Sequence, residues 1–363
     1  MLTRAGAGVV EVAVEHGIAG FLALFLRGLP GVPAELARSA ERARRAALAQ
    51  HLRVVSTLNL VSGVLQGLGA PWVVIKGPAL SSLVYSRPDL RSYGDLDVVV
   101  HHGAFGDALA ALEHAGCTVL DQNWPLVRAM HRGELSLRMP GGTILDLHWH
   151  LLNEPELRHA FTVPVPEALS RRHLTSIHGT PVAVLDPTDA VLHLILHGGL
   201  SGGHRLVWYA DLQQSLVHRP PDWDALCSRA LDAGAGDLAS VMLLRCRRLL
   251  GIHVPEQTWR SLCRRSPWGS GLRALSRLSS TTELVAGRRT GRSLFLATRS
   301  HAGESFAALS REAVRHMAAW PWLPEGLRRR NGSDPTIEML RRPSADDGAR
   351  SAYLRAVTTG VGP

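Results

Sequence analysis

The chain has 363 residues, 45 % of them hydrophobic, and a formal net charge of +9 that arginine carries almost alone, because Lys76 is the only lysine. This length is too great for one compact core and predicts two domains with additional segments. The charge favours partners that bear phosphate, such as nucleotides, nucleic acid or an anionic surface, but arginines scattered to solvate the surface explain it equally well. Basic and aromatic side chains are not interleaved along one face, which argues against an RNA- or DNA-binding protein.

The N-terminal region predicts a helical arm. Residues 5–27 have the pattern of one helix that ends at Gly28-Leu29-Pro30-Gly31, and residues 34–68 predict one long or slightly broken helix. Residues 17–26 are apolar, but this stretch is about half of the roughly 20 residues that a membrane span needs. No basic start leads into a small-residue cleavage site. We therefore expect a cytoplasmic protein without a membrane span, and peripheral membrane contact stays open.

Residues 70–152 have the pattern of a small mixed sheet with flanking helices. The β-branched run Trp72-Val73-Val74-Ile75 predicts a buried strand, and residues 95–100 predict a second one. Lys76-Gly77-Pro78 breaks the first strand, and proline suits the first turn of a helix. The other elements expected here are helices at 79–85 and 104–115, a strand at 117–120, and a hairpin of residues 135–139 and 144–151.

The chain after residue 152 is expected to be mostly helical, apart from a hairpin at 174–185. Helices are expected at 190–197, 205–217, 222–234, 237–250, 257–264 and 305–319. Glycine, serine, proline and charge prevail from Asn331 on and predict a loose tail. The fold class is therefore α/β (α+β), with an N-terminal helical arm (1–69), a core that holds the mixed sheet (70–152), a mostly helical domain (153–330) and the tail (331–363).

Three aspartates are the main candidates for chemistry. Asp95 and Asp97 are two residues apart at the start of a strand, so they point to the same face, about 6.6 Å apart along the axis. Carboxylates this close repel one another unless a cation lies between them. Asp146 lies in the alternating run Ile144 to His150, and an adjacent strand would bring it to the same place. Two Mg²⁺ ions about 3.5–4 Å apart need such a set of oxygen ligands.

An Asp-x-Asp pair at a strand start is common, and its context makes it more specific here. A Lys76-Gly77 break follows the preceding strand. Backbone N–H groups at such a glycine turn, leading into a helix N-terminus, can hold a triphosphate. The sequence thus predicts a metal site beside a phosphate site.

These residues resemble a largely uncharacterised bacterial nucleotidyltransferase family of the DNA polymerase β-like superfamily. The resemblance covers roughly residues 8 to 260. It rests on Ile75-Lys76-Gly77-Pro78-Ala79-Leu80, Tyr85, Pro88, Arg91, residues 95–100, the run Ile144 to Trp149, His193, His197, Trp208 and Asp211.

The resemblance implies transfer of a nucleoside monophosphate from an NTP, with ATP as the expected donor, using Mg²⁺ or Mn²⁺. Asp95 and Asp97 would hold both metal ions. Asp146 would bind the metal that activates the acceptor hydroxyl, or would act as its base. Gly77 would let the backbone approach the phosphates. An acceptor oxygen would then attack the α-phosphorus in line and release pyrophosphate. Residues 70–152 become the catalytic core and residues 153–330 the acceptor-side domain.

The phosphate site departs from the broad superfamily pattern. The usual Gly-Ser pair after the first strand is replaced by Lys76-Gly77-Pro78, and Pro78 removes one backbone donor. Lys76 is a candidate for contact with the β- or γ-phosphate, and the alternative is a strand-end lysine that reaches solvent. Arg91 is a candidate for phosphate contact, or for pairing with the aspartates.

Histidines raise a further metal hypothesis. His148 shares a strand face with Asp146 and is a candidate for cofactor binding, and His150 lies on the same face. His193 and His197 are four residues apart, a spacing that can chelate zinc, but no metalloprotease motif accompanies them. Structural or supporting roles are favoured for all four.

Two other functions stay open. One is a catalytically idle nucleotide-binding or peptide-recruiting module that serves as a maturation partner in a biosynthetic cluster. The other is a metal-dependent phosphohydrolase that uses the aspartates and histidines. The acceptor is also open among small molecules, peptides and proteins, with RNA less favoured.

Overall fold

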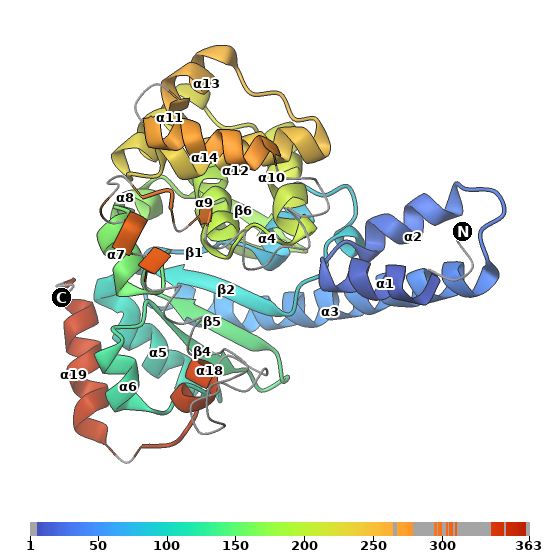
Figure 1. Cartoon of the computed structure of the whole chain (residues 1–363). Coiled ribbons are helices and arrows are strands. Elements are labelled where there is room, and N and C mark those ends of the chain that lie inside the picture. Colours follow the sequence, from blue (N-terminus) through green and yellow to red (C-terminus); the bar gives the residue numbers. More distant parts are fainter. Residues whose placement is uncertain are drawn as a thin grey trace, which may run out of the picture.

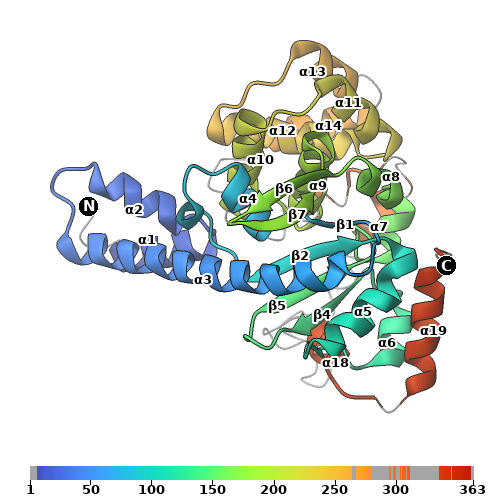
Figure 2. The ribbon, with the colours of Figure 1, turned by 180° about the vertical axis from the view of Figure 1, so that it is seen from behind.

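The protein is built on a mixed β-sheet with helices on both faces and a helical arm that projects from the body (Figures 1 and 2). The computed structural model describes residues 6–263, 267–278, 294–295, 297–299, 303, 305–307, 309–310, 335–344 and 346–360. Of the helix expected at 305–319, residues 305–307 and 309–310 are helical, and the rest lies outside the described residues.

The sheet has seven strands in the order β3-β4-β5-β2-β1-β7-β6. The strands are β1 (Trp72–Val74), β2 (Asp95–Val100), β3 (Thr118–Val119), β4 (Glu134–Arg138), β5 (Ile144–His148), β6 (His173–Ile177) and β7 (Thr180–Val184). The β2–β5 and β1–β7 pairs are parallel, and the other pairs are antiparallel. The predicted mixed sheet is confirmed, and its strands at 72–75 and 95–100 lie where the sequence places them.

The hairpin β6–β7 belongs to this sheet, although the sequence places it within the helical region. β7 pairs with β1 at Val74 and Val184. Val182 and Val184 enter the core on one face of the sheet, and Ala183 packs on the other face. A strand that is apolar on both faces is typical of a position inside a sheet.

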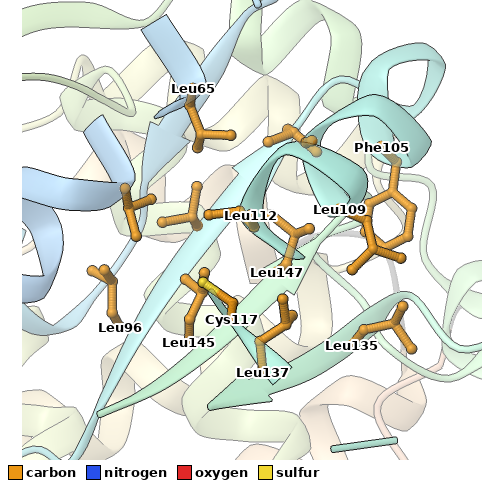
Figure 3. Packing of buried hydrophobic residues seen from close by; sticks show 14 of the residues in the cluster. Leu65, Leu96, Phe105, Leu109, Leu112, Cys117, Leu135, Leu137, Leu145 and Leu147 are labelled. Atoms are coloured by element: carbon orange, nitrogen blue, oxygen red, sulfur yellow. The ribbon is translucent and has the colours of Figure 1, made fainter. Parts of the chain in front are cut away.

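One face of the sheet holds the main core. Even-numbered residues of β2 and odd-numbered residues of β4 and β5 are leucine or valine, so alternation turns them all to this side. The covering helices are α3 (Ala34–Gln66), α5 (Phe105–His114) and α6 (Trp124–Ala129). Figure 3 shows Leu96, Leu135, Leu137, Leu145 and Leu147 of the sheet packed with Leu65, Phe105, Leu109 and Leu112 of the helices.

The opposite face carries the polar residues of the strands. Val73, Ile75 and Val99 pack there against α8 (Val165–Ser170). Asp95 and Asp97 share the face of Val99 because side chains alternate along β2.

Helices α9 to α14 lie on the polar side of the sheet (Figure 1). They surround a core of their own that includes Tyr209, Leu238 and Met242. The helices of this part are α7 (Pro155–Ala160), α9 (Pro187–Leu200), α10 (Leu206–His218), α11 (Trp223–Asp232), α12 (Gly236–Leu250), α13 (Glu256–Cys263) and α14 (Pro267–Leu278), and α4 (Gly77–Leu83) follows β1. Among the described residues, no helix combines the length and the hydropathy required to cross a bilayer.

The arm consists of α1 (Gly6–Glu15) and α2 (Ala19–Arg27) packed on the N-terminal half of α3. The single helix predicted for residues 5–27 is wrong, because the chain turns at Gly17, whose φ of +72° is left-handed. The long helix is confirmed as one helix of 33 residues.

The C-terminal segment is ordered over two helices, α18 (Pro335–Leu340) and α19 (Asp347–Thr358), and the predicted loose tail is wrong for these residues. α19 packs against α5 and α6. Its Tyr353 is fully buried, and the hydroxyl donates to the carbonyl of Arg132 at 2.7 Å. Ala349, Tyr353 and Val357 form an apolar stripe at helical spacing, which the polar composition of the segment obscures.

Candidate active site

Asp95, Asp97 and Asp146 lie on one face of two neighbouring parallel strands. Asp97 in β2 is directly opposite Asp146 in β5, and Asp95 is opposite Ile144. Neighbouring strands are about 4.8 Å apart, so the sheet register brings the three predicted carboxylates together. His148 is opposite Val99 and shares this face.

Asp97 is at the centre of the polar cluster and is only 3 % exposed. Lys76 places its Nζ 2.8 Å from Oδ1 of Asp97, and Nε2 of His148 lies 3.3 Å from the same oxygen. Burial works against the charge of Asp97, but Lys76 and His148 hold its pKa below the usual value. Burial also works against the charge of Lys76, and Asp97 raises the pKa of the ammonium on balance. Lys76 therefore reaches a carboxylate and not solvent.

Among the described residues, no basic side chain forms an equivalent ion pair with Asp95 or Asp146. Burial and then repulsion from Asp97 raise the pKa of Asp146 to about 7. The hydroxyl of Ser136 donates to Oδ1 of Asp146 at 2.7 Å. Burial and Asp97 also raise the pKa of Asp95, against the pull of Lys76 and Arg91. A cation that binds beside carboxylates with raised pKa values stabilises their ionised form.

Glu134 is a fourth carboxylate in the cluster, which the sequence analysis missed. Its Oε2 lies 3.2 Å from Nδ1 of His148, so the imidazole bridges Glu134 and Asp97. Glu134 also accepts a hydrogen bond from Arg132 at 3.0 Å. The alternating pattern of β4 could have indicated Glu134 as a site residue. The hairpin register sets Glu134 opposite His148 and Ser136 opposite Asp146. Burial opposes a charge on His148, but Glu134 and Asp97 raise its pKa.

The chemistry of the cluster fits a divalent cation, although its ligands are not assembled. Within the residues that the structure describes, no group of three or more His, Cys, Asp or Glu side chains is arranged to hold a metal ion. Lys76 instead supplies the positive charge beside Asp97. Carboxylate oxygens are the ligands that Mg²⁺ and Mn²⁺ prefer, and two of the three aspartates, Asp95 and Asp146, have raised pKa values.

His193 is a buried histidine close to Lys76 and Asp97. It is 4 % exposed, and within the described part of the chain neither ring nitrogen has a hydrogen-bond partner. Burial lowers its pKa to about 3, and the positive charge of Lys76 adds to the effect. Buried imidazole nitrogens are normally hydrogen-bonded to protein or to ordered water, so these two atoms are available to a polar group that enters near Lys76 and Asp97.

A cavity of about 430 Å³ opens beside the carboxylates. Its walls are the turn of Lys76 and Gly77, the loop from Arg91 to Asp95 with Asp97, and the residues His197, Arg205, Val207 and Trp208 around the start of α10. This volume is within the range of about 300–1,000 Å³ of small-molecule sites. Asp146 and His148 lie outside its lining.

Gly77 is required by the turn that it forms. Its φ is +45°, and a Cβ at this position would lie 3.2 Å from the carbonyl oxygen of Asp95 and from the ring of Tyr93. The predicted backbone cradle for phosphates is limited, because Pro78 has no N–H and the Ala79 N–H donates to the Lys76 carbonyl at 2.9 Å. Only the Gly77 N–H of these three positions can face a ligand.

Arg91 pairs with Asp211 of α10, not with the aspartates of β2 as one alternative proposed. Its Nε and Nη2 donate to the two carboxylate oxygens at 2.7 Å and 2.9 Å. The Tyr85 hydroxyl donates to the same carboxylate at 2.7 Å. Asp211 is 1 % exposed. The pair therefore joins the loop before β2 to the helical part, and Arg91 still lines the cavity.

The other two predicted histidines, His150 and His197, lie in different places. His150 turns back on its own chain and accepts from the Leu152 N–H at 2.9 Å, and burial lowers its pKa to about 3. His197 lines the cavity edge-on to Trp208, with ring centroids 5.9 Å apart.

Tyr93 and Arg205 are cavity residues that the sequence analysis did not single out. The Tyr93 hydroxyl lies 2.7 Å from Nδ1 of His51 in α3. Arg205 precedes α10 and donates from Nε to the Glu15 carbonyl at 3.0 Å. Tyr93 lies two residues before the predicted Asp95, so its position near the site is local, whereas only the packing of the fold brings Arg205 to the cavity.

A mixed sheet that presents clustered carboxylates beside a cavity with basic walls is typical of an enzyme that acts on phosphates. A family model described as an uncharacterised nucleotidyltransferase matches residues 7–251, more than half of the chain. The chain belongs to this family, as the resemblance in its sequence implies, and is a transferase. No curated protein and no solved structure matches it.

Proposed function

We propose that the protein transfers a nucleoside monophosphate from an NTP, with ATP as the expected donor, to an acceptor hydroxyl and releases pyrophosphate. The observation that carries this proposal is the register of β2 and β5, which sets Asp97 opposite Asp146 on the face where Asp95 borders the cavity. Family membership supports nucleotidyl transfer in general. The acceptor class is left to experiment.

In this proposal, Asp95 and Asp97 hold Mg²⁺ or Mn²⁺, and Asp146 is a further ligand or the base for the acceptor hydroxyl. When bound, the metal would stabilise negative charge on the reacting phosphate and on the leaving pyrophosphate. The raised pKa of Asp146, about 7, suits a carboxyl that accepts a proton near neutrality. His148 and Glu134 hold the orientation of Asp97 through one bridging imidazole.

One observation favours a second candidate, the catalytically idle nucleotide-binding module. Lys76 already neutralises Asp97 at 2.8 Å, so a metal ion at Asp97 has to compete with an ammonium group. If this competition always favours Lys76, the cavity can bind a nucleotide without a metal and without turnover.

The product distinguishes these functions. The protein is incubated with α-labelled and γ-labelled NTPs, Mg²⁺ or Mn²⁺, and pools of small-molecule, peptide and protein acceptors. Transfer predicts labelled acceptor and pyrophosphate, a phosphohydrolase predicts inorganic phosphate, and an idle module predicts binding alone. Asp95→Asn and Asp97→Asn should abolish transfer, whereas Asp107→Asn should not, because Asp107 is an exposed residue of α5. Equal activity in the wild type and both site variants contradicts the proposal.

A further inference from the structure

Three basic side chains line the cavity, and two of them are already neutralised. Lys76 pairs with Asp97, and Arg91 pairs with Asp211. Arg205 forms no ion pair with any carboxylate of the described residues. Its Nε donates to the Glu15 carbonyl, and its guanidinium lies 6.0 Å from the centroid of the Trp208 ring. The positive charge of Arg205 is thus available to an anion in the cavity.

The electrostatic surroundings of Arg205 agree with this view. Burial and the nearby charge of Arg91 lower its pKa, and the more weakly acting carboxylates Asp211, Asp95 and Glu15 offset only part of this effect. Asp211 already compensates Arg91, so Arg205 is the partly buried guanidinium whose charge an anion in the cavity would compensate.

In the described residues, the turn at Gly77 and the start of α10 offer few free backbone donors for an anion. The turn at Gly77 retains one N–H, because Pro78 has none and Ala79 is hydrogen-bonded. The first amides of α10 are also occupied, since Leu206 donates to Nδ1 of His16 at 3.3 Å and Val207 donates to the His16 carbonyl at 3.0 Å. A side-chain donor is therefore the stronger candidate for phosphate binding at these two walls of the cavity.

The arm holds Arg205 in position. The Gly17 carbonyl accepts from the Ser92 N–H at 3.2 Å, so residues 15–17 contact the loop before β2 as well as the start of α10. A Cβ at Gly17 would lie 3.0 Å from Cβ of Val207, and φ is +72°, so this close contact requires glycine. The break between α1 and α2 thereby joins two walls of the cavity.

We propose that Arg205 binds the phosphates of the NTP donor and that residues 15–17 of the arm fix the direction of its guanidinium. The planar guanidinium can donate two parallel hydrogen bonds to phosphate oxygens, which suits arginine to this role better than the compact ammonium of a lysine. The identification of the ligand as a triphosphate rests on the proposed function. The cavity then divides between a metal side at Asp95 and Asp97 and a phosphate side at Arg205.

The test measures binding of labelled ATP and of labelled pyrophosphate by equilibrium dialysis with Mg²⁺. Arg205→Met should lower the affinity for both ligands at least tenfold, and Arg205→Lys should recover part of this lost affinity. Arg53→Met, at an exposed site of α3, is the matched control and should bind as the wild type does. Circular dichroism melting verifies that each variant is folded.

The outcomes separate this inference from the proposed function. If the wild type transfers NMP and Arg205→Met binds both ligands normally, the phosphate role is wrong and the transferase proposal stands. If the wild type binds ATP and pyrophosphate through Arg205 without turnover, the phosphate role stands and the transfer proposal fails. A wild type that binds neither ligand overturns both.

A second pair of variants tests the arm. Gly17→Ala should weaken pyrophosphate binding several-fold, because the new methyl group forces the arm away from Val207. Gly8→Ala lies on the same arm with no atom within 4 Å of the added Cβ, and should bind pyrophosphate normally. Equal binding by the two variants would show that the arm does not position Arg205.

Discussion

The ammonium of Lys76 lies 2.8 Å from Oδ1 of Asp97, the carboxylate that is central to the polar face of the sheet. Lys76 lies two residues after the end of β1, and Asp97 is in the neighbouring strand β2, where its carbonyl accepts from the Ile75 N–H at 3.2 Å. The lysine is thus a cation built into the carboxylate site. A metal ion and Lys76 cannot both neutralise Asp97 fully, which makes their competition measurable.

Replacement of Lys76 by methionine should tighten Mn²⁺ binding about tenfold and make stability depend on metal. Without metal, the variant leaves Asp97 buried and without its main partner, which costs about 3 kcal/mol in the free energy of unfolding. Added Mn²⁺ should restore most of that loss. Electron paramagnetic resonance measures free Mn²⁺, and urea denaturation in EDTA or Mn²⁺ measures stability. Unchanged Mn²⁺ affinity would show that Lys76 does not compete with the metal.

The contact between Arg91 and Asp211 should contribute strongly to stability. Arg91→Met leaves the buried carboxylate of Asp211 with the Tyr85 hydroxyl alone, and removal of one partner from such a pair costs about 3–5 kcal/mol. The double variant Arg91→Met/Asp211→Leu should recover much of this loss, because no uncompensated charge remains. Urea unfolding of the two single variants and the double variant measures the coupling. Strictly additive losses would contradict a direct ion pair.

His51 should make stability depend on pH between about 4 and 6.5. Burial and the neighbouring His178 lower its pKa to about 4 in the folded protein, against about 6.5 in an unfolded chain. The unfolded state therefore binds more protons in this range, so the free energy of unfolding falls as pH decreases from about 6.5 to about 4.

The variant His51→Gln should flatten this dependence. The exposed His114→Gln serves as the control, and its stability should follow the wild-type slope. Urea unfolding at several pH values gives the slopes. A wild-type slope retained in His51→Gln would show that His51 is protonated equally in both states.

The sequence predicts local features of this protein well and long-range ones poorly. β2 begins at Asp95 and ends at Val100 as expected, because its alternation and the preceding glycine are local signals. The parallel pairing of β7 with β1 joins strands about a hundred residues apart, and no local pattern specifies it. The break at Gly17 has a local cause, because the Ile18 N–H donates to the Ala13 carbonyl and the Gly17 N–H to the Val14 carbonyl, as in a helix end that terminates at a left-handed glycine. Only the contact of Gly17 with Val207 depends on a distant helix.

The residues of the candidate site also divide into those that local sequence predicts and those that long-range packing brings in. The proximity of the three aspartates could be expected from side-chain alternation, once the strand of Asp146 is assumed to lie beside the strand of Asp95 and Asp97. Glu134 reaches His148 through the register of a hairpin, and Arg205 reaches the cavity through the packing of α10 and the arm. Lys76 stands out in the sequence as the sole lysine, but its partner depends on the turn between β1 and α4.

Gly77 sets that turn, and Gly77→Ala should reduce nucleotidyl transfer at least tenfold. A left-handed φ of +45° costs an alanine about 1–2 kcal/mol, and the new methyl group would press on the Asp95 carbonyl and the Tyr93 ring at 3.2 Å. Asp95 on the metal side and Tyr93 in the cavity wall would both be displaced. Gly63→Ala is the matched control, because its added Cβ meets no atom within 4 Å on α3. Normal turnover in a folded Gly77→Ala protein would show that the site does not need this backbone geometry.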